Sequence, residues 1–284
     1  MNRIPFAKAH GAGNDFVFSW VSELPAIVRE RALMDGQINP DYLGEVARAI
    51  CHRNMGVGAD GWYLMMPAEE AEAEIRLFNS DGSYAELSGN GTRCAAAVLV
   101  EAGLAGESVT IRTGSGLRKL RLLGRDSGVF RFEMEIGRLV VQPDQLRFSL
   151  PLTEGVREVA IVDVGNPQCA LEVDSLEFDW GRVGAEIEGH PHFPHRTNVS
   201  FYRVLDRNTI EARFFERGAG ATMSSGTGAT GAAIAAMARK SARSPVKVLT
   251  EAGPLEIRWE EEAFLTGPAE ITARGEFYWK EMGT

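Results

Sequence analysis

Several residue types that mark particular protein classes are scarce in this chain. Its 284 residues contain three cysteines, Cys51, Cys94 and Cys169, which are too few and too scattered for a disulfide framework or a cysteine zinc site. No apolar run reaches the length of a membrane span, and the opening residues MNRIPFAKAHGAGNDF lack the apolar core of a signal peptide. We therefore expect no membrane segment, a cytoplasmic location and no bound metal.

Positive charge is also in deficit, with 30 Lys and Arg against 39 Asp and Glu and a formal net charge of −9. This balance argues against nucleic acid or an anionic membrane as a partner, although it leaves room for a locally positive pocket that binds a small anion. The chain is longer than a single typical hydrophobic core, so two domains or lobes are expected. No low-complexity linker separates them.

Most of the sequence is typical of strands. Alternating or β-rich runs predict strands at Glu74–Phe78, Ser108–Thr113, Phe130–Ile136, Arg157–Val164, Asn198–Val204, Thr209–Phe215 and Leu255–Trp259. Helices are fewer. Asn39 and Pro40 suit the N-cap and first position of one helix, and two alanine-rich segments at about 89–102 and 226–240 predict enclosed helices.

The predicted fold class is α+β, with two pseudo-symmetric lobes. Each lobe is expected to be a mostly antiparallel wrap of strands around one central buried helix. The N-terminal lobe is predicted to span residues 1–132, with the C-terminal segment 274–284 returning to it. The C-terminal lobe is predicted to span residues 133–273.

The two alanine-rich segments have almost the same start. SGNGTRCAAA runs from Ser88 to Ala97 and SGTGATGAAI from Ser225 to Ile234, and five of the ten aligned positions are identical. The two serines are 137 residues apart (225 − 88), which is close to half of the chain. The repeat is the main sequence evidence for two related lobes.

A bare, glycine-rich helix start is suited to binding an anion. The helix N-terminus exposes unpaired backbone N–H groups and a partial positive charge, and glycine lets a ligand approach the backbone. For either segment alone, a serine N-cap on a well-packed helix explains the pattern equally well. The pair suggests more: two helix starts facing one cavity between the lobes could hold a carboxylate, with one side chain on each side of its α-carbon.

Further motifs extend this comparison along nearly the whole chain: HGAGNDFVF (10–18), FNSDGSYAELSGNGTRC (78–94), GNPQCA (165–170), FPHRTNVSF (193–201), FERGAGATMSSGTGA (215–229) and LTGPAEI (265–271). In this order they resemble the diaminopimelate epimerase family. The resemblance implies a cofactor-independent epimerase fold of two similar lobes. It also implies interconversion of LL- and meso-diaminopimelate, an amino-acid substrate for lysine and cell-wall synthesis, by a homodimer.

The resemblance also implies a set of site residues. Ser88 and Ser225 occupy the two catalytic positions. The positions that it assigns to substrate binding are Asn14, Asn79, Gly89, Asn90, Asn166, Asn198, Glu216, Arg217, Gly226 and Thr227. Arg217 is expected to meet the distal carboxylate and Glu216 the distal ammonium. Taken singly, each asparagine also suits a turn or strand end, and the Glu216–Arg217 pair an exposed ion pair.

Four positions depart from the family pattern. The family has cysteine where Ser88 and Ser225 stand, histidine where Gln168 stands, and glutamate where Ala221 stands. A thiol has a pKa near 8.5, whereas the pKa of an aliphatic hydroxyl should be close to that of water, which is roughly 7 units higher. This gap corresponds to about 10 kcal/mol. Because a helix N-terminus supplies at most about 2 kcal/mol, neither serine should ionise at pH 7 without a further base.

The source of such a base stays open at this stage. Cys94 is six residues past Ser88 and cannot replace it, and no spacing links His10 or His52 to either serine. His190, His192 and His195 lie in GHPHFPH, which suits a solvated loop better than a metal cluster. The serines fit either a deliberately inactivated enzyme or natural divergence, and Gln168 and Ala221 favour divergence. The alternatives to an epimerase are a same-fold isomerase or dehydratase of another amino acid, and a non-catalytic amino-acid-binding protein.

Overall fold

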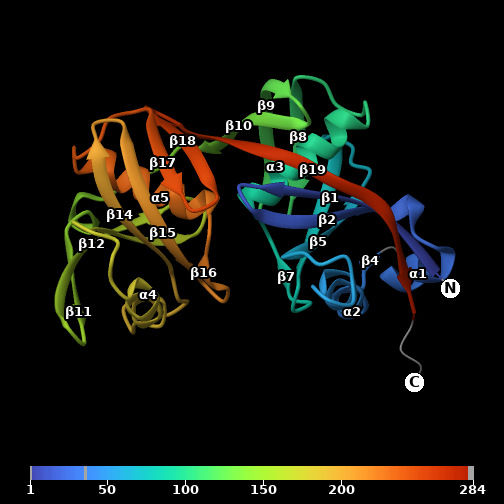
Figure 1. Ribbon diagram of the computed structural model, residues 1–284, viewed down its shortest axis with the longest axis horizontal. Coiled ribbons are helices and arrows are strands. Elements are labelled where there is room, and N and C mark those ends of the chain that lie inside the picture. The colour runs from blue at the N-terminus through green and yellow to red at the C-terminus, as the bar shows by residue number, and fades with distance from the viewer. Residues whose placement is uncertain (1, 35–36, 281–284) are drawn as a thin grey trace. The chain divides into compact units, whose positions relative to one another are not determined.

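The computed structural model contains two buried helices with glycine-rich starts, α3 (Gly89–Glu101) and α5 (Gly226–Ala238) (Figure 1). The structure describes residues 2–34 and 37–280. The chain divides into unit 1, Met1–Phe132 with Pro268–Thr284, and unit 2, Glu133–Gly267. The C-terminal return to unit 1 thus begins at Pro268. The sequence analysis placed this beginning six residues later, at residue 274. The last residues of the return, 281–284, lie outside the described part.

Unit 1 is made mainly of strands. Its helices are α1 (Ala26–Ala32), α2 (Pro40–Cys51) and α3, with a 3₁₀ turn at Val21–Glu23. Its strands are β1 (Asn2–Gly11), β2 (Asn14–Trp20), β5 (Gly61–Met66), β6 (Ala73–Asn79), β7 (Tyr84–Ala85), β8 (Ser108–Thr113) and β9 (Gly116–Asp126), with the small pair β3 (Leu33–Met34) and β4 (Gln37–Ile38). β1 pairs with the C-terminal strand β19 (Ala263–Trp279) from Asn2, opposite Trp279, to His10.

Unit 2 has the same style of architecture. Its helices are α4 (Trp180–Glu188) and α5, with a 3₁₀ turn at Pro143–Gln145. Its strands are β11 (Phe148–Leu152), β12 (Gly155–Asp163), β13 (Pro167–Glu172), β14 (Asn198–Asp206), β15 (Thr209–Glu216), β16 (Gly220–Thr222), β17 (Val246–Thr250) and β18 (Gly253–Trp259). The chain passes between the units in β10 (Val129–Gly137) and in β19.

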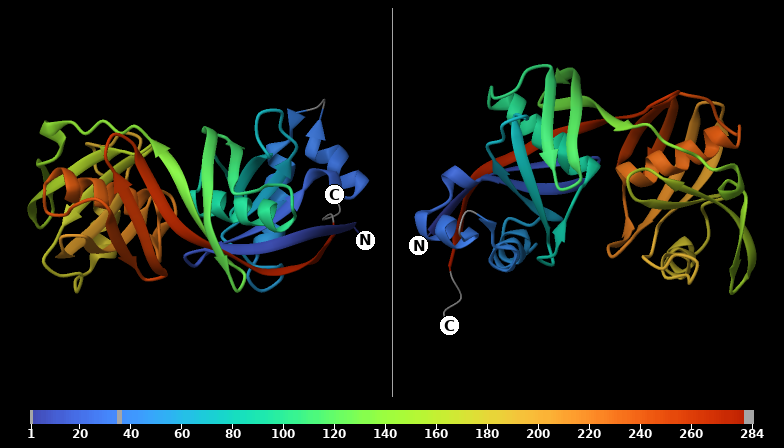
Figure 2. Two further views of the ribbon diagram at one scale, coloured as in Figure 1. Left: turned by 90° about the horizontal axis from the view of Figure 1, so that it is seen from above. Right: turned by 180° about the vertical axis from the view of Figure 1, so that it is seen from behind.

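Each unit wraps its strands around one helix whose sides are almost all buried. All residues of α3 from Gly89 to Leu99 are buried, and α5 is buried from Gly228 to Ala236. The small side chains of alanine and glycine let the strands approach closely. α5 packs against β12, β13, β14 and β18, and Figure 2 gives two more views of this orange helix against its strands.

Strand pairing shows that the two units are copies of one design. In unit 1, β5 pairs parallel with β2 and antiparallel with β6, and β6 pairs parallel with β8; β14, β15 and β17 repeat these three relations with β13 in unit 2. The register repeats as well. In unit 1, Trp62 lies opposite Phe78 and Thr113 lies opposite Gly116. In unit 2, 137 residues later, Val199 lies opposite Phe215 and Thr250 lies opposite Gly253. The separation of the two cap serines therefore holds from β5 to β9.

The predicted fold class and elements are confirmed. The two enclosed helices begin at the expected glycines, and the Asn39 side chain accepts a hydrogen bond from the Tyr42 N–H at 3.3 Å, as expected of an N-cap. The sequence analysis missed α1 and α4. α4 contains two glycines within nine residues, which weakens its intrinsic propensity, and its stability comes from packing on β14 and β15 and from the Asp179 N-cap.

Within residues 2–34 and 37–280, no helix combines the length and the apolar character that a membrane crossing requires. The same residues contain no group of three or more His, Cys, Asp or Glu side chains that could hold a metal ion. His190 and His192 lie in a loop after α4, where the His190 Nε2 is 2.9 Å from the Pro151 carbonyl oxygen and the His192 ring stacks on Phe148.

Candidate active site

Ser88 is the N-cap of α3 and defines half-site 1, the group of residues around the start of that helix. Its backbone is extended (φ −130°, ψ 123°), and its Oγ accepts a hydrogen bond from the Gly91 N–H at 3.2 Å. The Thr92 N–H donates to the Ser88 carbonyl oxygen at 2.9 Å. A helix leaves its first N–H groups without intrahelical partners. The amides of Gly89 and Asn90 are therefore left to point out of the helix start.

Ser225 is the N-cap of α5 and defines half-site 2 in the same way. Its backbone angles (φ −135°, ψ 124°) match those of Ser88 within a few degrees, and its Oγ accepts from the Gly228 N–H at 3.0 Å. The Ala229 N–H bonds to the Ser225 carbonyl oxygen at 2.9 Å. Gly226 and Thr227 thus stand where Gly89 and Asn90 stand in half-site 1. The serine N-cap reading of both motifs is confirmed.

Asn14 belongs to half-site 1 through a chain of side-chain amides. The Asn90 Nδ2 donates to the Asn14 Oδ1 at 3.5 Å, and the Asn14 Nδ2 donates to an oxygen of Asp60 at 2.6 Å. Asn90 is only 2% exposed. Asn14 follows Gly13, whose φ of 78° is easily reached only by glycine, so the tight β1–β2 turn aims the asparagine side chain.

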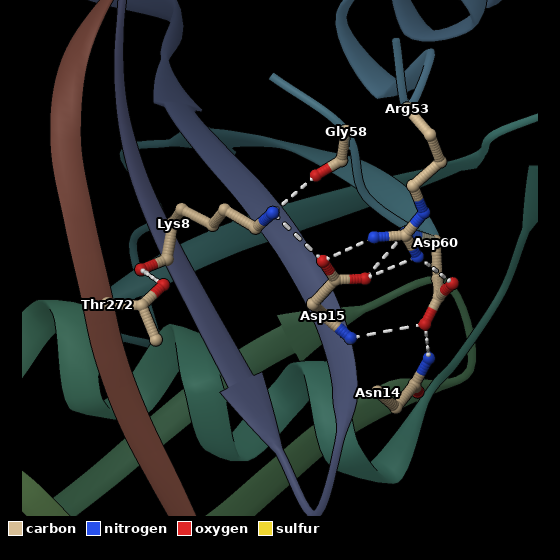
Figure 3. A network of polar contacts seen from close by, with 7 residues as sticks. All are labelled: Lys8, Asn14, Asp15, Arg53, Gly58, Asp60 and Thr272. Atoms are coloured by element: carbon tan, nitrogen blue, oxygen red, sulfur yellow. Dashed lines mark hydrogen bonds and ion pairs between the residues drawn. The ribbon is translucent and has the colours of Figure 1, made fainter. Parts of the chain in front are cut away.

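An ionic network holds the segment around Asn14 in place (Figure 3). The Arg53 guanidinium donates to both oxygens of Asp15, at 2.7 and 2.8 Å, and to Asp60 at 2.6 Å. Lys8 lies 3.0 Å from Asp15 on the other side. Burial alone would raise the pKa of Asp15, but Arg53 and Lys8 outweigh it and hold the pKa below its ordinary value. The ionised carboxylate therefore stabilises the fold.

Replacing Asp15 with asparagine should therefore destabilise unit 1 in a pH-dependent way. Because the folded-state pKa of Asp15 is lowered, its contribution is full above the unfolded value near 3.9 and is lost as the pH falls through the folded value. We expect Asp15→Asn to cost about 2 kcal/mol at pH 7, the range for hydrogen bonds to charged groups, and less at pH 3. Urea unfolding at both pH values measures this. The exposed Asp144→Asn is the control, and equal losses at the two pH values would contradict the prediction.

Arg93 adds a buried positive charge below half-site 1. It is fully buried, and its guanidinium donates to the carbonyl oxygens of Gly89 and Pro268 and to the Asn90 Oδ1, at 3.2, 3.3 and 2.5 Å. Burial lowers its pKa to about 10, so it stays charged at neutral pH. None of the acceptors that the described residues supply is a carboxylate. Its charge therefore adds to that of the helix start and favours an anion there.

Tyr63, on β5, brings a phenol close to Ser88. Its hydroxyl is buried beside Ser88 and Gly91 but makes no hydrogen bond of ordinary geometry to the described residues. Burial raises the pKa of the phenol far above its ordinary value, despite a small opposing effect of Ser88. Tyr63 therefore stays protonated and cannot act as the base that Ser88 lacks.

Ser225, by contrast, has a carboxylate partner. Its hydroxyl donates to the Glu216 Oε2 at 2.8 Å, and the Thr222 hydroxyl donates to the other oxygen, Oε1, at 2.8 Å. Glu216 is the last residue of β15 and Thr222 the last of β16, and the pairing of these two strands brings them to the start of α5. Ser225 itself is 2% exposed.

Arg217 and Asn198 are held together in half-site 2. The Asn198 Oδ1 accepts from the Arg217 backbone N–H at 3.0 Å, and its Nδ2 donates to the Pro167 carbonyl oxygen at 3.1 Å. The exposed Arg217 guanidinium donates to the His195 carbonyl oxygen at 3.2 Å. Glu188 supports the same turn, since it accepts from the Gly218 N–H at 3.2 Å and from Arg196 at 3.0 Å.

Two of the expected asparagines, Asn79 and Asn166, make side-chain hydrogen bonds within their own turns. The Asn79 Nδ2 donates to the Ser83 Oγ at 3.0 Å within a turn. The Asn166 Oδ1 accepts from the Gln168 Nε2 at 2.7 Å. Gln168 is fully buried against Gly231 of α5, and its Oε1 has no hydrogen-bond partner among the described residues. Asn79 and Asn166 thus retain the turn role that their local sequence also allowed.

None of the three cysteines can supply a thiolate. All are buried and free. Burial raises the pKa of Cys51 and of Cys94 to about 12 and raises that of Cys169 further. The expectation that Cys94 does not replace Ser88 agrees with its place inside α3.

Sequence reasoning overlooked four residues that shape these half-sites: Tyr63, Arg93, Glu188 and Thr222. Arg93 lies inside a quoted motif, four residues after Gly89, and that spacing could have indicated a contact along the helix. Thr222 could have been inferred from the short turn after Glu216. Glu188 and Tyr63 reach their places through tertiary packing, and no local pattern marks them.

Solved structures of an epimerase and of a probable racemase share the architecture of this chain. A hydroxyproline epimerase from Agrobacterium vitis superposes with a TM-score of 0.72 at 15% identity, covering 96% of this chain and 92% of that one. A probable proline racemase from Agrobacterium radiobacter K84 gives 0.69 at 16% identity, over 99% of this chain and 93% of that one. At such low identity these likenesses establish the fold, which is shared by epimerases and racemases.

The sequence comparisons identify the family. The family model described as Diaminopimelate epimerase matches residues 6–138 and 160–272. Diaminopimelate epimerase from Moorella thermoacetica is 37% identical and covers 96% of this chain and 98% of its own length. That of Synechococcus sp. (strain JA-3-3Ab) is 38% identical, with 94% and 96% covered. The chain belongs to the diaminopimelate epimerase family, and by family it is an amino-acid epimerase.

Proposed function

We propose that this chain binds diaminopimelate and interconverts its LL- and meso-isomers, a step in the synthesis of lysine and of peptidoglycan precursors. Ser88 and Ser225 are assigned to the two proton transfers, one on each face of the reacting α-carbon. The observation that carries the proposal is the match between the half-sites: each serine caps a buried helix with nearly the same backbone angles and binds the N–H three residues on. The relatives named above support the substrate.

The substrate would be held by the residues that surround the two caps. The free helix N–H groups of Gly89, Asn90, Gly226 and Thr227 suit the α-carboxylate at the reacting centre. By the family resemblance, Arg217 is assigned to the distal carboxylate and Glu216 to the distal ammonium. The asparagines assigned to the zwitterionic ends through amide donors and acceptors are Asn14, Asn79, Asn166 and Asn198.

We expect the interconversion of the two isomers to be slow, because neither serine hydroxyl can act alone as a base at neutral pH. A specific observation therefore favours a second candidate, a protein that binds the amino acid without inverting it. Gln168 occupies the position of the family's histidine, is fully buried and spends its amide on Asn166. In this reading the pocket is kept and the acid–base groups are lost. A further candidate is a same-fold isomerase or dehydratase of another amino acid, because such a reaction could need only one proton transfer.

Three further features belong to the proposal. Two acid–base groups suffice for the inversion, so no cofactor is assigned. A homodimer is proposed by analogy with the family. A cytoplasmic location is proposed because the three cysteines are free and buried, as in a reducing compartment.

Ligand binding is the first test of the proposed function. Meso-diaminopimelate at 100 times its dissociation constant should stabilise the folded chain by about 2.7 kcal/mol. Thermal unfolding monitored by circular dichroism and titration calorimetry measure this, with L-lysine, which lacks the second carboxylate, as the control ligand. A folded protein whose Tm does not change at millimolar diaminopimelate would rule out both the epimerase and the binding-protein reading.

A further inference from the structure

The hydroxyl of Ser225 differs from that of Ser88 in one respect, which is where its proton goes. The Ser225 Oγ accepts one hydrogen bond from the Gly228 N–H at 3.0 Å and gives its own proton to the Glu216 Oε2 at 2.8 Å. The Thr222 hydroxyl fixes the second carboxylate oxygen at 2.8 Å. Both hydroxyls thus donate to the same carboxylate. A ligand that approached a free lone pair of the Ser225 Oγ would have the Glu216 base on the other side of the serine.

The internal repeat provides a control for this arrangement within the same molecule. Gly61 lies opposite Asn79 in unit 1, and the residues 137 positions later are Asn198 and Glu216. By the same register Ala85 corresponds to Thr222. Half-site 1 therefore has a neutral amide and a methyl group where half-site 2 has a carboxylate and a hydroxyl. The Asn79 amide donates to Ser83, and the Tyr63 phenol near Ser88 is held protonated by burial.

From this asymmetry we propose that Glu216, acting through Ser225, is the base of the site and that the chain exchanges the α-hydrogen of its substrate on one face only. The activity is α-hydrogen exchange with retained configuration, and it is faster than inversion. This inference rests on the proposed amino-acid substrate. It reassigns Glu216 from the distal ammonium to the base of half-site 2, because its carboxylate is bonded to the cap serine.

The step is balanced within the groups named. The substrate Cα–H bond breaks as its proton moves to the Ser225 Oγ, while the serine's own proton moves to the Glu216 Oε2. The electron pair stays on the α-carbon and is delocalised into the substrate α-carboxylate, next to the helix N–H groups. The Glu216 carboxylic acid exchanges its proton with water, and the reverse relay returns a solvent proton to the same face. Inversion would require Ser88 to donate a proton as well. Among the described residues, no carboxylate is hydrogen-bonded to Ser88 as Glu216 is to Ser225, so the proton of Ser88 should be replaced more slowly.

The relay removes the difficulty of a free serine alkoxide, because Ser225 gains one proton as it loses another. Glu216 is suited to this role by geometry as well as charge, since two hydroxyl donors hold it and a strand end carries it. Its removal should therefore affect the reaction more than binding. General-base catalysis contributes about 10²- to 10⁴-fold, and the loss should fall within that range.

The test is deuterium exchange in D₂O with each diaminopimelate isomer in turn, followed by proton NMR and chiral chromatography. The unmodified chain is expected to incorporate deuterium with configuration retained, at a rate at least tenfold above inversion. Glu216→Gln should lose 10²- to 10⁴-fold of the exchange. Glu186→Gln is the matched control, because Glu186 also accepts from a threonine hydroxyl, that of Thr153 at 2.8 Å, but lies on the surface of α4. Its exchange should equal that of the unmodified chain.

The outcomes separate this inference from the function on which it rests. If the unmodified chain does not bind diaminopimelate by calorimetry, the proposed function fails. If it binds but shows no exchange, if inversion keeps pace with exchange, or if Glu216→Gln exchanges as fast as Glu186→Gln, the one-face relay is overturned while the binding function stands. Should Glu216→Gln not fold, Thr222→Val serves in its place. It removes only the Oε1 hydrogen bond and should slow exchange about tenfold, and an unchanged rate would overturn the relay.

Discussion

Installing cysteine at both cap positions should restore rapid epimerisation. In the Ser88→Cys, Ser225→Cys double variant, each sulfur would accept the helix N–H that now binds the serine Oγ, from Gly91 and from Gly228. A helix start lowers the pKa of a thiol further from its ordinary value near 8.5, so a thiolate is available at neutral pH. We expect a gain of about 10²- to 10⁴-fold in the rate of LL-to-meso conversion, the usual range for acid–base catalysis.

Chiral chromatography of the product, with both variants checked for folding by circular dichroism, measures this gain. Ser224→Cys is the control, because Ser224 is 3% exposed and adjacent to Ser225 but does not cap the helix. Its rate should equal that of the unmodified chain. A folded double variant that binds diaminopimelate and inverts it no faster than the control would show that the serines are not the cause of slow inversion.

Substituting Gly91 with alanine should severely destabilise unit 1. A Cβ at this position would lie 2.2 Å from the Tyr63 hydroxyl oxygen and 2.4 Å from its Cε2. The ring cannot move aside, because it stacks on Phe18 at 5.0 Å and meets Phe16 edge-on at 5.3 Å, and all three residues are buried. Overpacking of this kind costs about 1–3 kcal/mol, and we expect a loss near 3 kcal/mol.

Urea unfolding of Gly91→Ala measures this loss, and two further variants locate its cause. Gly106→Ala is the control, because no atom lies within 4 Å of a Cβ there, and it should change the stability by less than about 0.5 kcal/mol. Tyr63→Leu combined with Gly91→Ala should be less unstable than the sum of the two single variants, since removing the ring relieves the clash. A loss for Gly91→Ala no larger than that of the control would mean that the tyrosine side chain yields.

The sequence was sufficient to predict the repeated part of the architecture. Glycine-rich starts on alanine-rich segments predict enclosed helices, because such segments have no polar face, and α3 and α5 begin at the expected residues. Alternation of apolar and polar residues predicted strands such as β10 and β15, because successive side chains of a strand point to opposite faces. By contrast, α4 was missed because its two glycines weaken its helix propensity, and packing on neighbouring strands contributes much of its stability.

The site could be predicted in its parts but not in its connections. The motifs indicated both cap serines and Glu216, yet the bond between Ser225 and Glu216 depends on how β15, β16 and α5 meet. The same holds for Tyr63, which is near Gly91 only because β5 passes beneath α3. Contacts of this kind are fixed by strand register, and a single residue's pattern does not reveal them. Arg217 and Glu216 were assigned to the substrate from the motif alone, and that assignment stays a prediction.

The pairing of β1 with β19 has a consequence for synthesis on the ribosome. β1 emerges first, and its residues Asn2 to His10 pair with β19. The pairing part of β19 is translated after all of unit 2. At roughly 5–20 residues per second, the interval between the two is on the order of ten seconds or more. During that time unit 2, which is one continuous stretch of chain, can fold, while the edge of β1 remains open to wrong partners. We therefore expect nascent chains stalled before residue 268 to depend on chaperones for the N-terminal part alone.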